Sequence, residues 1–149
     1  MIGICEGRLA SFLFLRHNEN KMLAMFHRKF PNAKQVEFSP EDFTIYEKMR
    51  EASKCKTKRL EFLKNNAIIT GTPFQEEVWG VLARLDCITC YQKVAQIIGR
   101  EESARAVGLA VGANALHLIV PCHLIVKKNG DVGNYAGGSD LKKRLIDDL

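Results

Sequence analysis

Cys122 and His123 are the neighbouring residues of this chain best suited to covalent chemistry, and they follow Pro121 at the end of an apolar run. Cysteine attacks an electrophile as its thiolate, and a nearby imidazole that takes the thiol proton forms this species near neutral pH. A Cys-His pair alone is a weak signal. The pair still predicts a nucleophile, Cys122, with His123 as the adjacent base.

Two other segments accompany this pair. Residues 103–108 read Ser-Ala-Arg-Ala-Val-Gly, and residues 133–138 read Gly-Asn-Tyr-Ala-Gly-Gly. Together with Pro121-Cys122-His123 they resemble the O6-alkylguanine-DNA alkyltransferases, which repair DNA by taking an alkyl group onto their own cysteine. The resemblance extends from Gly71 to about Leu145 and is faint before that. It implies transfer from O6 of guanine, and more weakly from O4 of thymine, to Cys122, with no cofactor and one reaction per molecule.

The resemblance also implies roles for residues around Cys122. His123 would act on the thiol through a water, and Tyr91 would donate a hydrogen bond to a guanine ring nitrogen, which makes the base a better leaving group. The residues expected to contact the substrate are Ile125, Tyr135, Ala136 and Gly137. Among them, Tyr135 would wall the guanine pocket, the backbone N–H of Ala136 would reach O6, and Gly137 would leave room for bulky adducts.

Residues 104–113 are expected to form a helix that is nearly bare of large side chains, with Arg105 as its one long cation. Glycine in a helix interior costs about 1 kcal/mol relative to alanine, so this small face favours close approach of another backbone, from a helix or from DNA. In the family this helix enters the minor groove, and the matching arginine replaces the flipped base. The expected DNA-binding residues are Ala104, Arg105, Gly108 and Asn114, and Asn114 would also tie the helix to the Cys122 segment.

Two positions depart from the family pattern. Leu124 stands where the family has an arginine after Cys-His, which removes a charge. Three consequences are open: lower DNA affinity, altered local packing, or compensation by Lys127 or Lys128. The glutamate that orients the histidine in the family falls at Leu149, and Asp147 or Asp148 would have to substitute for it.

The elements that position these residues follow from capping and periodicity. Residues 72–75 combine an N-cap threonine, a first-turn proline and a capping-box glutamine, which predicts a helix start. A second helix is expected at residues 91–98 with Gly99 as its stop, and Ser103 would cap the third, which completes a helix-turn-helix. Residues 117–120 predict a strand that leads into Cys122.

The end of the chain and the N-terminal half predict further elements. Ser139 would cap a last helix whose inward residues are Leu141, Leu145 and Ile146. Strands are expected at residues 2–5 and 9–15, joined by a hairpin turn at Glu6-Gly7-Arg8. Helices are expected at residues 21–30, where apolar residues form a helical stripe, and after Ser39. The basic run at residues 54–64 favours a solvated face over a DNA contact. The sequence therefore predicts an α+β fold: a truncated, ribonuclease-H-like domain at 1–70, and a DNA-binding and alkyl-transfer domain at 71–149.

Composition limits the possible partners and compartment. The net charge of +5 suits a polyanionic partner, expected to be double-stranded DNA that carries O6-alkylguanine. Five irregularly spaced cysteines argue against a secreted disulfide framework and for a reduced intracellular compartment, the nucleus in a eukaryote or the cytoplasm in a prokaryote. Cys87 and Cys90 have CxxC spacing but lack two further zinc ligands, so a turn between helices is favoured and no metal is expected. No membrane span is expected, and the protein is expected to be a monomer.

Two other functions remain open from the sequence. A lesion-binding protein would flip the alkylated base without reacting with it, and a helix-turn-helix regulator would use Cys122 to sense alkylating agents or oxidants. An alkyl adduct on Cys122 after exposure to O6-methylguanine DNA separates the three functions.

Overall fold

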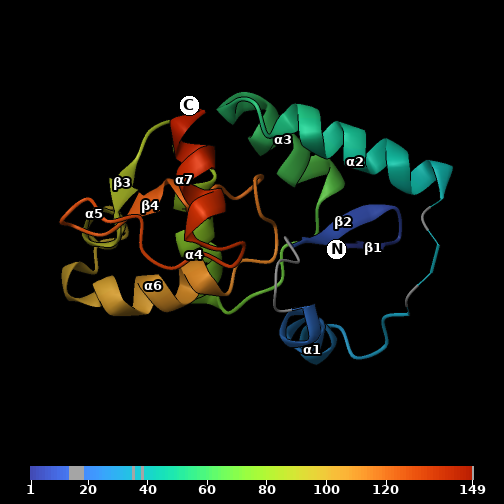
Figure 1. The fold of residues 1–149 in the computed structure, drawn as a ribbon, viewed down its shortest axis with the longest axis horizontal. Coiled ribbons are helices and arrows are strands. Elements are labelled where there is room, and N and C mark those ends of the chain that lie inside the picture. Colours follow the sequence, from blue (N-terminus) through green and yellow to red (C-terminus); the bar gives the residue numbers. More distant parts are fainter. Residues whose placement is uncertain (14–18, 35, 38, 149) are drawn as a thin grey trace.

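A β-hairpin opens the fold, and helices form most of the remainder (Figure 1). The computed structural model describes residues 1–13, 19–34, 36–37 and 39–148. Strands β1 (Ile2–Cys5) and β2 (Arg8–Phe12) pair antiparallel, as the sequence predicts. Glu6 and Gly7 join them with φ values of 49° and 70°, which is the positive-φ geometry of a tight hairpin turn. The predicted second strand stops at Phe12, and residues 14 and 15 of that prediction lie outside the described part.

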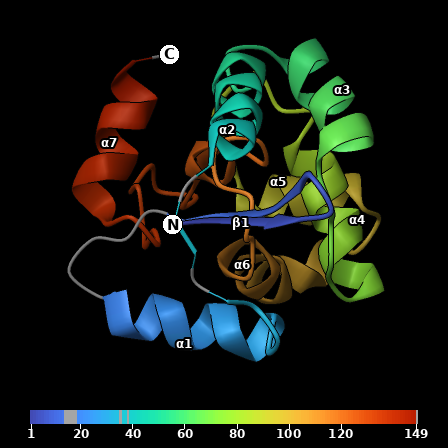
Figure 2. The same ribbon diagram turned by 90° about the vertical axis from the view of Figure 1, so that its right-hand side faces the viewer.

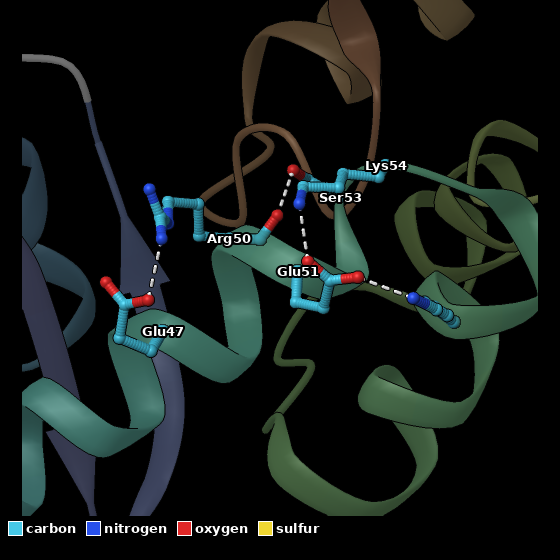
Figure 3. Close-up of polar contacts among 6 residues, drawn as sticks. Glu47, Arg50, Glu51, Ser53 and Lys54 are labelled. Atoms are coloured by element: carbon cyan, nitrogen blue, oxygen red, sulfur yellow. Dashed lines mark hydrogen bonds and ion pairs between the residues drawn. The ribbon is translucent and has the colours of Figure 1, made fainter.

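Three helices follow in the N-terminal half: α1 (Glu19–Lys29), α2 (Pro40–Ala52) and α3 (Lys56–Asn66). Ser39 caps α2 as predicted, because its hydroxyl accepts from the Asp42 N–H and the Asp42 carboxylate accepts from the Ser39 N–H. Exposed ion pairs line α2, such as the one between Glu47 and Arg50 at 2.8 Å (Figure 3). Pairs of this kind add little to stability.

The C-terminal half holds the predicted pair of helices. Helix α4 (Pro73–Leu82) begins with the expected capping box between Thr72 and Gln75. Helix α5 (Tyr91–Ile97) stops near Gly99, whose φ is 68°. The short 3₁₀ helix η1 (Glu101–Ser103) then leads into α6 (Ala104–Gly112). Ser103 precedes α6, but its side chain makes no capping hydrogen bond, since its ψ of 17° differs from the extended backbone that capping uses.

The predicted strand at residues 117–120 is wrong. These residues form a turn in which Leu118 has a φ of 72° and the Val120 N–H bonds to the Leu116 carbonyl at 2.8 Å. The chain must reverse there to bring Cys122 back toward the end of α6. Cys122 then begins a short 3₁₀ helix, η2 (Cys122–Leu124).

A second small sheet follows. Strand β4 (Ile125–Val126) pairs in parallel with β3 (Thr89–Cys90), so the second cysteine of the CxxC lies in a strand and not in a simple turn. The last helix, α7, spans Ser139–Asp147. Gly138, with a φ of 88°, occupies the cap position predicted for Ser139, so the serine is already the first helical residue.

One continuous core contains apolar side chains from both halves of the chain, among them Leu9, Met49, Val78 and Ile119. The hairpin reaches the C-terminal half directly: the Phe12 N–H bonds to the Ala115 carbonyl at 2.7 Å, and the His117 N–H bonds to the Phe12 carbonyl at 3.1 Å. The hairpin thus holds the loop that leads to Cys122. Within the described ranges, every helix is too short or too polar to cross a membrane.

Candidate active site

Asn114 positions the Cys122 segment. Its side-chain N–H₂ group donates to the Val120 carbonyl at 2.9 Å and to the Cys122 sulfur at 3.2 Å. Its oxygen accepts from the Leu116 N–H at 2.9 Å. Both ends of the amide are therefore bonded inside the protein, and the residue is 4% exposed. The expected tie between the end of α6 and the cysteine has this geometry.

The Cys122 thiol is buried, and burial raises its pKa. Four influences lower this pKa: the hydrogen bond from Asn114, the positive charge of Lys142, the backbone N–H of Cys122 itself, and the Tyr135 hydroxyl within hydrogen-bond reach of the sulfur. Burial has the larger effect, so the resting residue is a thiol. A thiolate must be formed at the moment of reaction by removal of the proton.

His123 is 7% exposed, and burial together with the charges of Arg59 and Lys142 lowers its pKa to about 4. Its imidazole is therefore neutral at pH 7 and able to accept a proton. Within the described part of the chain, Nδ1 of His123 has no hydrogen-bond partner, and no hydrogen bond joins His123 to the thiol. Asp147 and Asp148 have exposed side chains, and Leu149, the position expected for the glutamate, lies outside the described residues.

The cation beside His123 comes from α3 and was missed in the sequence. The Arg59 guanidinium is buried, donates to the carbonyls of Ser53 and Leu85, and lies 3.7 Å from Asp86. In the sequence, Arg59 is one of several basic residues at 54–64, and nothing distinguishes it from its exposed neighbours. Leu124 packs in the core, and Lys127 and Lys128 are exposed.

Lys142 was also missed. Its side chain on α7 is 1% exposed, and its ammonium donates to the carbonyls of Ile125 and Val132. Leu141, Leu145 and Ile146, predicted to face inward, are only half-buried. Because lysines normally lie on the exposed face of an amphipathic helix, the sequence does not predict that Lys142 is buried.

A cavity of about 540 Å³ opens beside the thiol. Six of the predicted residues line it: Tyr91, Gly108, Asn114, Cys122, Tyr135 and Ala136. His117 lines it as well, and its ring centroid lies 5.7 Å from that of Tyr135. Burial raises the pKa of both tyrosines, so their hydroxyls stay protonated and can donate hydrogen bonds.

Two residues expected at the substrate do not line this cavity. Ile125 is fully buried, because its pairing in β4 directs it into the core, and the glycine Gly137 is also buried. The Ile125 carbonyl accepts a hydrogen bond from the Lys142 ammonium.

The small face of α6 is not required by packing inside the protein. A Cβ at Gly112 would meet no atom within 4 Å, and one at Gly108 would touch the Tyr91 ring at an ordinary 3.8 Å. Arg105 is exposed, Ala104 is half-buried, and Leu109 is 74% exposed. The face is therefore open to a partner from outside.

The CxxC cysteines belong to no metal site that the described residues reveal, since these contain no cluster of three or more histidine, cysteine or carboxylate groups.

Some known proteins match most of the chain, and others match about half of it. A regulatory protein ada of Salmonella typhimurium is 32% identical over 131 residues, 87% of this chain and 36% of that protein. A methylated-DNA–protein-cysteine methyltransferase of the same organism is 45% identical over 78 residues, 51% of this chain and 46% of that protein. The chain thus spans about half or less of the length of these curated relatives.

Solved structures agree with the fold. The Mycobacterium tuberculosis OGT in complex with DNA is 37% identical, has a TM-score of 0.54, and covers 55% of this chain and 51% of its own. The O6-methylguanine-DNA methyltransferase of Pyrococcus kodakaraensis, at 24% identity, supports the fold alone, with a TM-score of 0.72 over 97% of this chain and 87% of its own.

A family model described as "6-O-methylguanine DNA methyltransferase, DNA binding domain" matches residues 73–148. This match contains the helix pair, the buried thiol and the loop that lines the cavity, and it covers slightly more than half of the chain. The chain therefore belongs to the 6-O-methylguanine DNA methyltransferase family.

Proposed function

We propose that this chain repairs DNA by transferring an alkyl group from O6 of guanine, and more weakly from O4 of thymine, to Cys122. The observation that carries the proposal is the buried thiol of Cys122, which Asn114 holds at the edge of a cavity lined by two protonated tyrosines. Residues 71–149 would bind DNA and carry the reaction, as one domain, and the protein would act as a monomer on genomic DNA inside the cell.

The reaction forms one bond and breaks one. Cys122 loses its proton to neutral His123, directly or through a water, and the sulfur attacks the alkyl carbon in line with its bond to O6. The carbon–oxygen bond breaks, and its electron pair goes to guanine. Protonated His123 then gives its proton to guanine. Tyr91 would donate to the purine as this charge develops. The product is a thioether on Cys122, so each molecule reacts once.

DNA binding would use the open face of α6. Its small residues allow the minor groove to approach the helix backbone, and exposed Arg105 can enter the space left by the flipped nucleotide. Flipping is needed because O6 lies within the base pair, where a protein thiol cannot reach the alkyl carbon.

The test is incubation of the protein with duplex DNA that carries one O6-methylguanine, followed by intact mass measurement and peptide mapping. A methyl adduct confined to Cys122, with guanine restored in the DNA, is expected. Cys122→Ala should bind the duplex but gain no adduct, and Cys90→Ser, which changes a half-buried cysteine outside the cavity lining, should react normally.

The same experiment tests the two rival functions. Tight binding of alkylated duplex without any adduct would contradict transfer and favour a lesion binder. An adduct formed only with free alkylating agents or oxidants, together with preference for one undamaged DNA sequence, would favour a regulator.

A further inference from the structure

The cavity beside Cys122 has a wall that the predicted site residues do not supply. Its volume of about 540 Å³ falls in the range that accommodates drug-sized ligands, and a methylated purine base is smaller than such ligands. Leu13, Phe26, Lys29 and Phe30, all from the N-terminal half, line this part. Apart from the lysine, these side chains are apolar.

Phe26 and Phe30 form an aromatic pair on this wall. Phe26 lies in α1, and Phe30 directly follows the helix and donates its N–H to the Phe26 carbonyl at 2.8 Å. Their ring centroids are 5.0 Å apart with an interplanar angle of 43°. The Phe26 ring lies against the backbone of β1, since a Cβ at Gly3 would come within 2.8 Å of it. Gly3 therefore leaves the room that this ring occupies.

Contacts with the C-terminal half hold α1 in place. The Lys29 ammonium lies 5.1 Å from the centre of the Trp79 ring, a cation–π distance. The indole N–H of Trp79 donates to the Ala110 carbonyl of α6 at 2.8 Å. α1 therefore lies beside the C-terminal end of α6, below the hairpin (Figures 1 and 2).

We infer that Phe26 and Phe30 form a subsite for the alkyl substituent and that it favours arylmethyl groups such as benzyl. This inference rests on the proposed function, because it concerns the group attached to the carbon that Cys122 attacks. In-line attack leaves the rest of the substituent pointing to the side of the reaction axis, inside the same cavity. A benzyl ring there would pack against the phenylalanine pair in a tilted or offset arrangement.

The test measures binding separately from chemistry. Free O6-benzylguanine and free O6-methylguanine are titrated calorimetrically into the Cys122→Ala protein and into the same protein carrying Phe30→Ala or Phe26→Ala. Each truncation should weaken benzylguanine binding about tenfold and leave methylguanine binding within about twofold. Phe30→Leu, which keeps apolar volume, should fall between, and Phe43→Ala, at a 52% exposed residue of α2, is the matched control.

Reaction rates of the Cys122 proteins complete the test. Equal weakening for both bases, or no change for either, would overturn the subsite. Faster reaction with both substrates after Phe30→Ala would also overturn it, because α1 would then act as a barrier to entry. Selective loss of benzylguanine binding without any transfer by the Cys122 protein would support the subsite and reject the proposed function.

Discussion

At the scale of single residues, the candidate site combines a thiol whose pKa is raised with a histidine whose pKa is lowered. Burial is the largest cause of both shifts, so both groups are neutral at rest. The charge on Lys142 favours the Cys122 thiolate and disfavours protonated His123. The charge of Lys142 therefore lowers the pKa of both Cys122 and His123 without a hydrogen bond to either side chain.

Lys142→Met should raise the pKa of the Cys122 thiol, since it removes the cation that favours the thiolate. Labelling of Cys122 by iodoacetamide should then need higher pH than in the wild type. The variant should also lose about 1–3 kcal/mol of unfolding free energy, because two carbonyls lose their donor. Lys143→Met changes an exposed neighbour and should alter neither. An unchanged pH–rate profile would show that the lysine has no electrostatic role.

His123→Ala should slow labelling of Cys122 and move its pH dependence upward, because the adjacent proton acceptor is lost. We expect a clear but moderate effect, since the described residues offer Nδ1 of His123 no orienting partner. The measurement is the rate of thiol labelling from pH 6 to 10, a range chosen to include the ordinary cysteine pKa of about 8.5. Identical profiles for the two proteins would exclude His123 as the base.

At the scale of elements, α6 meets the cavity at one end and solvent along its exposed face. Its glycines weaken the helix, and packing within the protein does not require them at Gly108 or Gly112. Because these glycines lower helix stability and no contact within the protein requires them, we expect this face of α6 to contact a partner.

Gly108→Ala should therefore separate stability from DNA binding. Alanine should raise the unfolding free energy by about 0.5–1 kcal/mol, because its Cβ would make only an ordinary contact with Tyr91. The same methyl group should weaken binding to duplex DNA. Thermal unfolding and fluorescence anisotropy test the two parts, and tighter or unchanged DNA binding would show that this position does not face the groove.

Arg105→Ala should slow repair of duplex DNA at least about tenfold more than reaction with free O6-benzylguanine. The proposed role of Arg105 is to hold the base outside the helix, which a free base does not need. Single-turnover rates on both substrates provide the measurement. Arg144→Ala, at an exposed arginine of α7, is the control for loss of charge. Equal losses on both substrates would argue against the wedge role.

At the scale of the whole molecule, two buried histidines make stability depend on pH. Burial lowers the pKa of His117 to about 4, as it does for His123 with help from nearby charges. The unfolded chain regains a histidine pKa of about 6.5. Between these values the unfolded state binds more protons than the folded state, so stability falls as pH falls from 6.5 toward 4.

As the pH falls from 6.5 to 4, each of the two histidines should lower the free energy of unfolding by up to about 3 kcal/mol. Urea unfolding at pH 7 and pH 5 measures the loss. His117→Gln should reduce the difference between the two pH values, whereas His27→Gln, at an exposed residue, should leave it unchanged. An equal pH dependence in His117→Gln would contradict the assignment to His117.

Local signals in the sequence were sufficient for the helix starts at Ser39 and Thr72, the turn at Gly7 and the stop at Gly99, because caps and positive φ angles depend on a few adjacent residues. The motif around Cys122 likewise predicts the family whose model matches residues 73–148. Burial of Arg59 and Lys142 was decided by the tertiary structure, since their partners are backbone carbonyls from distant or unpredicted segments.

The turn at residues 117–120 and the wall formed by α1 also depended on tertiary contacts. An apolar run predicts a strand, but Asn114 and the hairpin carbonyl of Phe12 instead bind the loop and bend it toward the end of α6. Phe26 and Phe30 showed only a helical stripe in the sequence. Their position at the cavity arises from contacts with Gly3 and with the Lys29–Trp79 pair. The sequence by itself determined the motif that predicts Cys122 as the nucleophile, and long-range packing decided the charges and cavity walls that surround it.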